Sequence, residues 1–270
     1  MKIDDFELLK RKIMRERGFN CKCYKESSLK RRIRIRMKAN NIHSYSEYIR
    51  FLTGNEEEYD KLIDVLTVNV TEFFRDSETY DKIKELILPE LISRKREEGR
   101  KIIRIWSAGC ASGEEPYSIS ILLREYLGDK IDDFIIFIRA TDIDEKSLEL
   151  ARKGEYKSDA LKNVKKHFIR KYFEKVNDGY RIRDSIRNMV KFGKHDIISG
   201  KTQRYFDLIL CRNVLIYLSR DAQKSLFEMF HQALNKKGYL IIGKTETMHE
   251  QMPNKFELID LSERIYREIS

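Results

Sequence analysis

The sequence predicts an α/β fold, in which helices cover both faces of a mostly parallel sheet. An all-helical domain precedes the sheet, and a small antiparallel β insertion interrupts it. Apolar residues recur at helical spacing before residue 95. After that point short, continuous apolar runs alternate with helical stretches, which is typical of buried parallel strands. An Asn-Asp-Gly turn between two short apolar segments indicates a hairpin within this second part.

The helical N-terminal part is predicted by three apolar stripes and contains no strand pattern. Their members are Phe6, Leu9 and Ile13, then Leu29, Ile33 and Met37, then Tyr48, Leu52, Tyr59, Leu62 and Leu66. We expect three regions along the chain: a helical N-terminal domain at 1–75, a linker helix at 76–95, and a sheet domain at 96–270.

The predicted strands of the parallel sheet are five apolar runs. They read IIRIWSAG (102–109), FIIFIRATD (134–142), NMVKFGKHD (188–196), FDLILCRN (206–213) and GYLIIGK (238–244). The β insertion is expected at about 155–188, where Asn177-Asp178-Gly179 supplies the turn of a hairpin. The final KFELIDLSERIYREI predicts an antiparallel hairpin at the end of the sheet.

Composition excludes several classes of protein. Hydrophobic residues make up 41% and charged residues 36%, with only three prolines, so the chain should fold. No run approaches the ~20 apolar residues of a membrane helix, and the start lacks a signal-peptide pattern, which favours the cytoplasm. The four cysteines are too scattered for a disulfide framework, and Cys21-x-Cys23 lacks a second ligand pair, so we expect no metal site.

Positive charge is concentrated at the N-terminus. The net charge is +10, and residues 1–50 hold 15 Lys and Arg against 6 Asp and Glu. Residues 27–38 read as a helix after a serine cap, with an exposed face formed by Lys30, Arg31, Arg34 and Lys38. Such a face favours an acidic partner; a solvated surface or a nucleic-acid contact are the alternatives.

The first predicted strand runs into a glycine loop, SAGCASGEEPYS, that then begins a helix. Ligands of open α/β sheets bind beyond the carboxyl ends of the strands, where small residues let the backbone approach them. The glycine spacing is G-x-x-x-G, and Glu114 and Glu115 would repel a pyrophosphate at the helix N-terminus. A cofactor without phosphates therefore fits better.

Polar residues also follow the other predicted strands. In ATDID, Asp142 is placed to accept hydrogen bonds from ribose hydroxyls, and Asp144 fits better as a helix cap. In CRNVLIY, Asn213 and Tyr217 lie near the same edge, although a turn residue and a core aromatic are the structural alternatives. TVNVTEFFR, before the sheet, reads in isolation as an amphipathic helix.

Together TVNVTEFFR, SAGCASGEEPYS, ATDID and CRNVLIYL closely resemble the bacterial and archaeal chemotaxis methyltransferase family known as CheR, in that family's order. The resemblance spans the whole chain. It implies a Rossmann-like class I S-adenosylmethionine-dependent methyltransferase with a receptor-binding N-terminal domain. The implied enzyme is a protein-glutamate O-methyltransferase. It would form glutamate methyl esters on methyl-accepting chemotaxis receptors during sensory adaptation and release S-adenosylhomocysteine.

The resemblance also implies the residues of the site. Those expected to bind S-adenosylmethionine are Asn69, Thr71, Arg75, Glu114, Asp142, Asp196, Ile197, Asn213 and Val214. Asp142 would bind the ribose, and Asp196 with Ile197 would lie near the adenine. The position of Asp196 is often Asn in relatives, and the glycine loop with Cys110 is less rich in alanine than usual.

The expected reaction is displacement of the sulfonium methyl by a glutamate carboxylate, which is ionised near pH 7 because its pKa is about 4.3. No general base is needed, so the enzyme supplies alignment. Arg75 is expected to orient the carboxylate, with Tyr217 as a hydrogen-bonding neighbour; an ordinary salt bridge to an acid of the glycine loop is the alternative for Arg75.

The resemblance places the basic face of Lys30, Arg31, Arg34 and Lys38 against the acidic cytoplasmic coiled coil of the receptor. The short VNDGY turn in the β insertion favours an enzyme that needs no tether to the receptor tail. We expect a cytoplasmic monomer that is recruited to membrane receptor arrays, without membrane insertion or bound nucleic acid.

Two rival functions are compatible with the sequence. A nucleic-acid methyltransferase would also suit a basic N-terminal domain, but enzymes that methylate exocyclic amines carry Asn/Asp-Pro-Pro-Tyr where this chain has CRNVLIY. A non-enzymatic module could use the same fold to sense the cofactor. The complete set of expected site residues argues against a decayed site.

Overall fold

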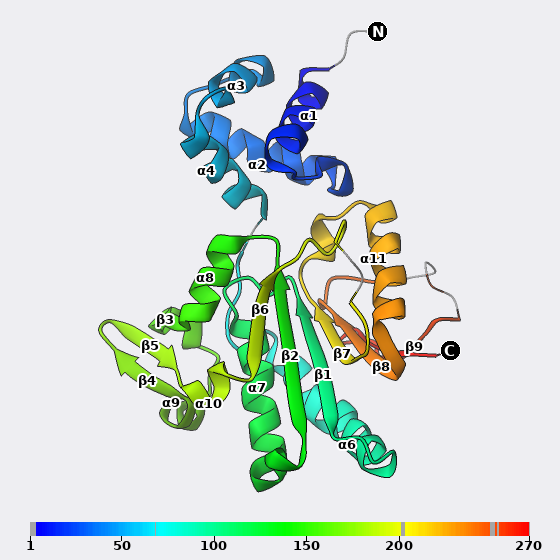
Figure 1. Ribbon diagram of the computed structural model, residues 1–270. Coiled ribbons are helices and arrows are strands. Elements are labelled where there is room, and N and C mark those ends of the chain that lie inside the picture. Colours follow the sequence, from blue (N-terminus) through cyan, green and yellow to red (C-terminus); the bar gives the residue numbers. More distant parts are fainter. Residues whose placement is uncertain (1–3, 68, 201–202, 249–251, 253, 270) are drawn as a thin grey trace. The chain divides into compact units, whose positions relative to one another are not determined.

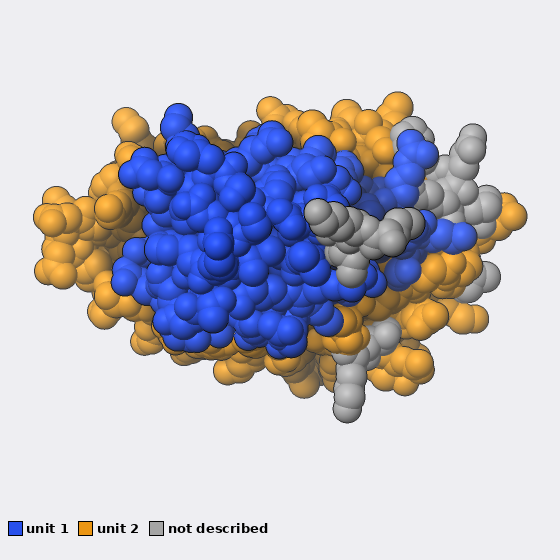
Figure 2. Space-filling view, turned by 90° about the horizontal axis from the view of Figure 1, so that it is seen from above, with its two compact units in different colours: residues 1–69, 217–225 blue, residues 70–216, 226–270 orange. Residues whose placement is uncertain are grey.

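The computed structural model describes residues 4–67, 69–200, 203–248, 252 and 254–269. The chain forms two compact units, which Figure 2 shows in two colours. The first, here the helical unit, contains residues 1–69 and 217–225. The second, here the sheet unit, contains residues 70–216 and 226–270.

The helical unit is built on four helices that bury the predicted apolar stripes. They are α1 (Asp5–Arg17), α2 (Glu26–Ala39), α3 (Tyr45–Leu52) and α4 (Glu56–Thr67), with a short 3₁₀ helix at Cys21–Cys23. Each predicted stripe residue is buried. A buried carboxylate links three of the helices, because Glu58 accepts hydrogen bonds from Arg36 at 3.0 and 2.6 Å and from the Tyr48 hydroxyl at 2.7 Å.

The expected serine cap of α2 is wrong. The helix begins at Glu26, and the preceding Lys25 makes no side-chain capping bond. The carbonyl of Lys25 already accepts the N–H groups of Ser28 and Leu29, at 3.0 and 3.1 Å, so Ser27 and Ser28 lie inside the first turn. The negative charge of Glu26 favours a helix start at this point.

The sheet unit contains a seven-stranded sheet in the order β6-β2-β1-β7-β8-β10-β9. The strands are β1 (Ile102–Ala108), β2 (Ile135–Asp142), β6 (Val190–Lys194), β7 (Phe206–Cys211), β8 (Leu234–Ile242), β9 (Phe256–Asp260) and β10 (Ile265–Glu268). The first five pair in parallel, and β10 is antiparallel to both β8 and β9. The five predicted strands and the terminal hairpin are confirmed.

Helices pack on both faces of this sheet, as Figure 1 shows. The helices of the unit are α5 (Ser77–Lys82), a π-helical segment (Ile83–Ile87), α6 (Leu88–Glu97), α7 (Glu114–Leu127), α8 (Glu145–Lys153), α9 (Lys166–Tyr172), α10 (Asp184–Arg187) and α11 (Arg220–Ala233), which starts in the helical unit. Short 3₁₀ helices lie at Gly128–Asp133, Ser158–Leu161 and Leu215–Tyr217.

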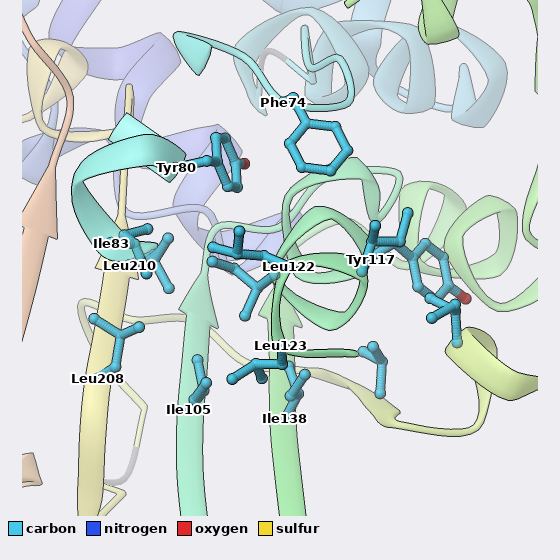
Figure 3. Packing of buried hydrophobic residues seen from close by; sticks show 14 of the residues in the cluster. Phe74, Tyr80, Ile83, Ile105, Tyr117, Leu122, Leu123, Ile138, Leu208 and Leu210 are labelled. Carbon is cyan, nitrogen blue, oxygen red and sulfur yellow. The ribbon is translucent and has the colours of Figure 1, made fainter. Parts of the chain in front are cut away.

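The core lies between the strands and α7. Ile105, Ile138 and Leu208 of the strands pack in one cluster with Leu122 and Leu123 of α7 (Figure 3). Each fully buried side chain of this size contributes roughly 1.5–3 kcal/mol to the hydrophobic stabilisation. On the other face the Trp106 ring lies 5.6 Å from that of Phe230 in α11.

The β insertion is confirmed as a three-stranded antiparallel sheet. Its strands are β3 (Glu155–Lys157), β4 (Phe173–Val176) and β5 (Gly179–Ile182), in the order β3-β5-β4. Asn177 has a φ of 42° in the hairpin turn, as the Asn-Asp-Gly pattern predicts. A Cβ at Gly179 would lie 2.4 Å from the carbonyl oxygen of Tyr156, so only glycine fits there. None of the described helices is long and apolar enough to span a membrane.

Candidate active site

The glycine loop between β1 and α7 has an unusual backbone. Gly109, Ala111 and Gly113 have φ values of 80°, 45° and 95°. The N–H groups of Gly109 and Cys110 both donate to the carbonyl of Thr141 at the end of β2, at 2.8 and 3.0 Å. A Cβ on Gly109 would lie 2.7 Å from the Val214 side chain. The loop therefore requires a glycine where it passes the segment after β7.

Asp142 links the end of β2 to the glycine loop. Its Oδ2 accepts a hydrogen bond from the Ala111 N–H at 2.8 Å, and its Oδ1 accepts one from the Asp144 N–H at 3.0 Å. Burial raises the pKa of this carboxyl group. Asp144 caps α8 by accepting from the Lys146 N–H, so its predicted role is confirmed. The ribose contact of Asp142 stays a prediction.

Two carboxylates stand at the N-terminus of α7, where Glu114 is buried and Glu115 is half-buried. Glu114 accepts hydrogen bonds from the Ser112 hydroxyl at 3.0 and 2.8 Å, and burial raises the pKa of Glu114 to about 7. Glu115 accepts from the Ser107 hydroxyl at 2.7 Å, and burial raises its pKa also. Because both side chains are acidic, this helix end does not suit a phosphate.

The TVNVTEFFR segment is not a helix, so the interpretation from its sequence in isolation is wrong. The helix α4 ends at Thr67, Val68 lies outside the described residues, and residues 69–76 form no helix. Phe74 and Asp76 have φ values of 51° and 55°, which a right-handed helix excludes.

Two phenylalanines hold this segment on the sheet unit. The Phe73 ring lies 4.8 Å from the Tyr156 ring and 5.2 Å from the Phe173 ring in the β insertion. The Phe74 N–H donates to the Ser118 hydroxyl of α7 at 2.9 Å. The Phe74 ring lies 5.0 Å from the Tyr80 ring of α5 and 5.9 Å from the Phe168 ring of α9. The two rings thus pack against different elements.

The side chains of Arg75 and Arg212 make different contacts. Arg75 Nη1 donates to the Val70 carbonyl at 2.9 Å, and Arg75 forms no ion pair with the acidic residues that the structure describes. The expected alternative, a salt bridge to the glycine loop, belongs instead to Arg212. Its side chain is 2% exposed, and it binds Asp76 at 2.5 Å, the Arg75 carbonyl at 3.0 Å and Glu115 at 3.6 Å.

The segment after β7 turns at Asn213, whose φ of 61° confirms it as a turn residue. Its N–H and that of Ile216 both donate to the carboxylate of Glu246, at 3.1 Å each. Val214 lies against Gly109 of the glycine loop. Asn213 and Val214 are thus brought beside the ends of β1 and β8, as the sequence predicts for a shared edge.

Asp196 and Ile197 follow β6. Asp196 accepts hydrogen bonds from the Ile198 N–H at 2.9 Å and from the Ser199 hydroxyl, so its carboxylate closes a tight turn. The preceding His195 N–H donates to the Asp142 carbonyl at 2.9 Å. This bond places the Asp196 turn next to the end of β2.

Asn69 and Tyr217 belong to the helical unit. The Tyr217 ring lies 4.2 Å from the Arg32 guanidinium carbon, and its carbonyl accepts from the Lys25 N–H at 2.8 Å. In the same unit the predicted basic face of α2 is accessible. It lines an open groove of about 530 Å³ formed by Ser27, Lys30, Arg31, Arg34, Ile35 and Lys38.

Two known family models match the chain, and they cover its helical and sheet parts. Residues 4–67 match the family described as "CheR methyltransferase, all-alpha domain", and residues 69–265 match "CheR methyltransferase, SAM binding domain". The chain belongs to the CheR methyltransferase family.

Relatives of this CheR-family chain are similar over most of their length. The chemotaxis protein methyltransferase of Borreliella burgdorferi is 37% identical, over 86% of this chain and 83% of its own. That of Listeria innocua is 32% identical, over 90% of this chain and 89% of its own. Chemotaxis protein methyltransferase 1 of Pseudomonas aeruginosa is 30% identical, over 96% of this chain and 95% of its own. A solved S-adenosylmethionine dependent methyltransferase from Mesorhizobium loti is 18% identical over 52% of this chain and 45% of its own, with a TM-score of 0.30.

The CheR assignment confirms the predicted enzyme class, fold class and S-adenosylmethionine dependence. The residues present also fit this cofactor, which is a cation without phosphates. Glu114 is buried beside a hydroxyl and forms no ion pair with the described basic residues. A cationic amino group would compensate this buried carboxylate. The glycine at position 109 likewise leaves room that any side chain would remove.

Two charged residues that contact the segments of the candidate site were not predicted from the sequence of this CheR-family chain. Arg212 is a charged residue directly after a fully buried strand, and Glu246 stands four residues after the end of β8. The sequence signal that could have identified them is a charged side chain at or shortly after the end of an apolar run. Nothing in the sequence indicates their partners.

Proposed function

We propose that this CheR-family enzyme transfers the methyl group of S-adenosylmethionine to glutamate side chains of chemoreceptors, forming methyl esters and S-adenosylhomocysteine. The observation that carries the proposal is a pair of buried carboxylates, Glu114 and Asp142, at the carboxyl edge of the sheet. Neither forms an ion pair with a described residue. They stand in the domain that matches the S-adenosylmethionine-binding family.

We assign the cofactor contacts as follows. Glu114 binds the cationic amino group, and Asp142 accepts from the ribose hydroxyls through lone pairs that its two backbone bonds leave available. Asp196 and Ile197 lie at the adenine. The remaining contacts are Asn69, Thr71, Arg75, Asn213 and Val214. When bound, the cofactor supplies an electrophilic methyl group on a sulfonium.

The chain's own residues then align the substrate. A receptor glutamate is ionised near pH 7, so no residue needs to remove a proton. Arg75 orients this carboxylate through its guanidinium group, with Tyr217 as a hydrogen-bonding neighbour. Arg212 holds the Arg75 carbonyl and thereby the backbone that carries the guanidinium. Alignment of this kind can account for roughly 7–11 kcal/mol of the barrier.

Residues 1–75 form the receptor-binding region in this proposal. The exposed face of α2 carries Lys30, Arg31, Arg34 and Lys38, which suits an acidic helical domain. The tight hairpin at Asn177 favours action without a tether. The enzyme works in the cytoplasm as a monomer recruited to receptor arrays, with neither nucleic acid nor membrane insertion involved.

The proposal is tested by transfer of label from methyl-labelled S-adenosylmethionine to receptor cytoplasmic fragments, with tRNA and DNA in parallel. We expect base-labile label on the receptor, because methyl esters hydrolyse in base. Label on nucleic acid alone would instead establish the nucleic-acid methyltransferase. Cofactor binding without any transfer would favour the sensor module.

Charge reversal on α2 should weaken receptor recognition only. We expect Arg31→Glu with Arg34→Glu to raise KM for the receptor about tenfold or more, because two attractive contacts become repulsive. The Kd for S-adenosylhomocysteine should not change. Lys84→Glu with Lys130→Glu is the matched control, since both are exposed lysines of the sheet unit and the net charge changes equally. Equal KM values in the two variants would contradict the role of α2.

Cofactor affinity should depend on pH through Glu114. Below its pKa of about 7 the carboxyl group is protonated and neutral, and binding a cationic amino group requires its ionisation. The Kd for S-adenosylhomocysteine should therefore rise roughly tenfold per pH unit below that pKa. Titration calorimetry from pH 5.5 to 8.5 measures this, and Glu114→Gln should bind weakly with a flat profile. A steep profile in the glutamine variant would assign the titration to another group.

A further inference from the structure

Glu246 is a buried carboxylate for which the proposed reaction has no use. It lies in the segment after β8, is 3% exposed, and forms no ion pair with the basic residues that the structure describes. Burial raises the pKa of this carboxyl group. Placing an unpaired carboxylate inside a protein is costly unless hydrogen bonds compensate it.

Backbone N–H groups from two separate segments provide that compensation. Oε2 accepts from Gly243 at 2.5 Å and from Asn213 at 3.1 Å, and Oε1 accepts from Ile216 at 3.1 Å. The Glu246 N–H in turn donates to the Gly243 carbonyl at 2.8 Å, which closes the turn after β8. Only an ionised carboxylate offers acceptors on both oxygens and no donor.

The loop that Glu246 binds, residues 213–216, is confined on two sides. On one side a Cβ at Gly243 would lie 2.8 Å from Glu246 Oε2 and 2.9 Å from the Asn213 nitrogen. On the other side Val214 lies against Gly109. Asn213 itself has a left-handed backbone, a conformation that asparagine adopts more readily than most residues.

We propose that Glu246 is a positioning residue that holds loop 213–216 in the shape with which Asn213 and Val214 meet the cofactor. It acts through the backbone of the loop and does not itself touch the cofactor. The inference rests on the proposed function, because the cofactor contacts of Asn213 and Val214 belong to that proposal.

The test compares wild type with Glu246→Gln, which replaces one acceptor oxygen by an N–H donor that faces backbone donors. Gly243→Ala disturbs the same contact from the other side, because the added Cβ would crowd Glu246 Oε2 and the Asn213 nitrogen. Glu268→Gln is the matched control: Glu268 is also buried and accepts from the Lys237 N–H at 2.9 Å, but it does not contact the loop. The readouts are Kd for S-adenosylhomocysteine, steady-state kinetics, and amide hydrogen exchange.

We expect Glu246→Gln and Gly243→Ala to weaken S-adenosylhomocysteine binding about 10- to 100-fold, as for lost hydrogen bonds to a charged group. The amide hydrogens of Asn213 and Ile216 should exchange faster. The KM for S-adenosylmethionine should rise while the KM for the receptor stays the same. Glu268→Gln, a purely structural change, should leave both KM values at the wild-type level.

Wild-type affinity and unchanged amide protection in Glu246→Gln would overturn the inference. So would equal effects in Glu268→Gln. Wild-type protein that bound no S-adenosylhomocysteine would contradict the proposed function instead, and the exchange rates would still decide whether Glu246 holds the loop. If Glu246→Gln does not fold, Gly243→Ala tests the same contact with the carboxylate retained.

Discussion

Replacing Arg75 by alanine is expected to lower kcat for receptor methylation by about 10²- to 10³-fold, the usual effect of removing one group that stabilises or orients reacting charge. The stability of the protein should change by less than about 0.5 kcal/mol, because the side chain is half-exposed and its hydrogen bond goes to the neighbouring Val70 carbonyl. Initial rates at saturating cofactor and receptor, together with urea unfolding, measure the two quantities.

Arg94→Ala is the matched control for this experiment. Arg94 also donates to a backbone carbonyl at 2.9 Å, that of Lys237, and it lies on α6. We expect its kcat to equal that of wild type. A similar loss in both variants, or a full kcat in Arg75→Ala, would show that Arg75 does not align the substrate.

The Arg212→Met variant should lose about 3–5 kcal/mol of unfolding free energy, the usual cost of removing one partner of a buried ion pair. Arg212 compensates Glu115 and Asp76, and its removal leaves the Glu115 carboxylate, which is 13% exposed, with the hydrogen bond from the Ser107 hydroxyl but without its ion pair. Urea unfolding at pH 7.5 measures the loss. Adding Glu115→Gln to this variant should recover part of it, because the uncompensated charge is then absent.

Arg267→Met is the comparison on the surface. Arg267 forms ion pairs with Glu90 and Glu257 but is more exposed, so we expect a change below about 1 kcal/mol. If the two arginine variants lost equal stability, or if Glu115→Gln gave no recovery, the ion pairs of Arg212 would not be what stabilises this part of the sheet unit.

Much of the candidate site could be predicted because its residues stand at the ends of apolar runs. The positions of Glu114, Asp142 and Asn213 follow from the rule that parallel strands bring their carboxyl ends to one edge. The conformation of the segment at 69–76 could not be predicted in this way. Its local spacing favours a helix, but the Phe73 ring packs against Tyr156 and the Phe74 ring against Tyr80, and tertiary packing overrides the local preference.

By itself the sequence determined the helical domain, the order of the strands along the chain, the β hairpin, and the family. Each of these follows from periodicity or motifs within short windows. Only the tertiary structure decided the partners of Arg212 and Glu246. Arg212 meets Asp76 across 136 residues, and Glu246 meets Asn213 across 33. The physical reason is that a buried charge is compensated by whatever groups folding brings to it, and their positions are set by packing rather than by sequence spacing.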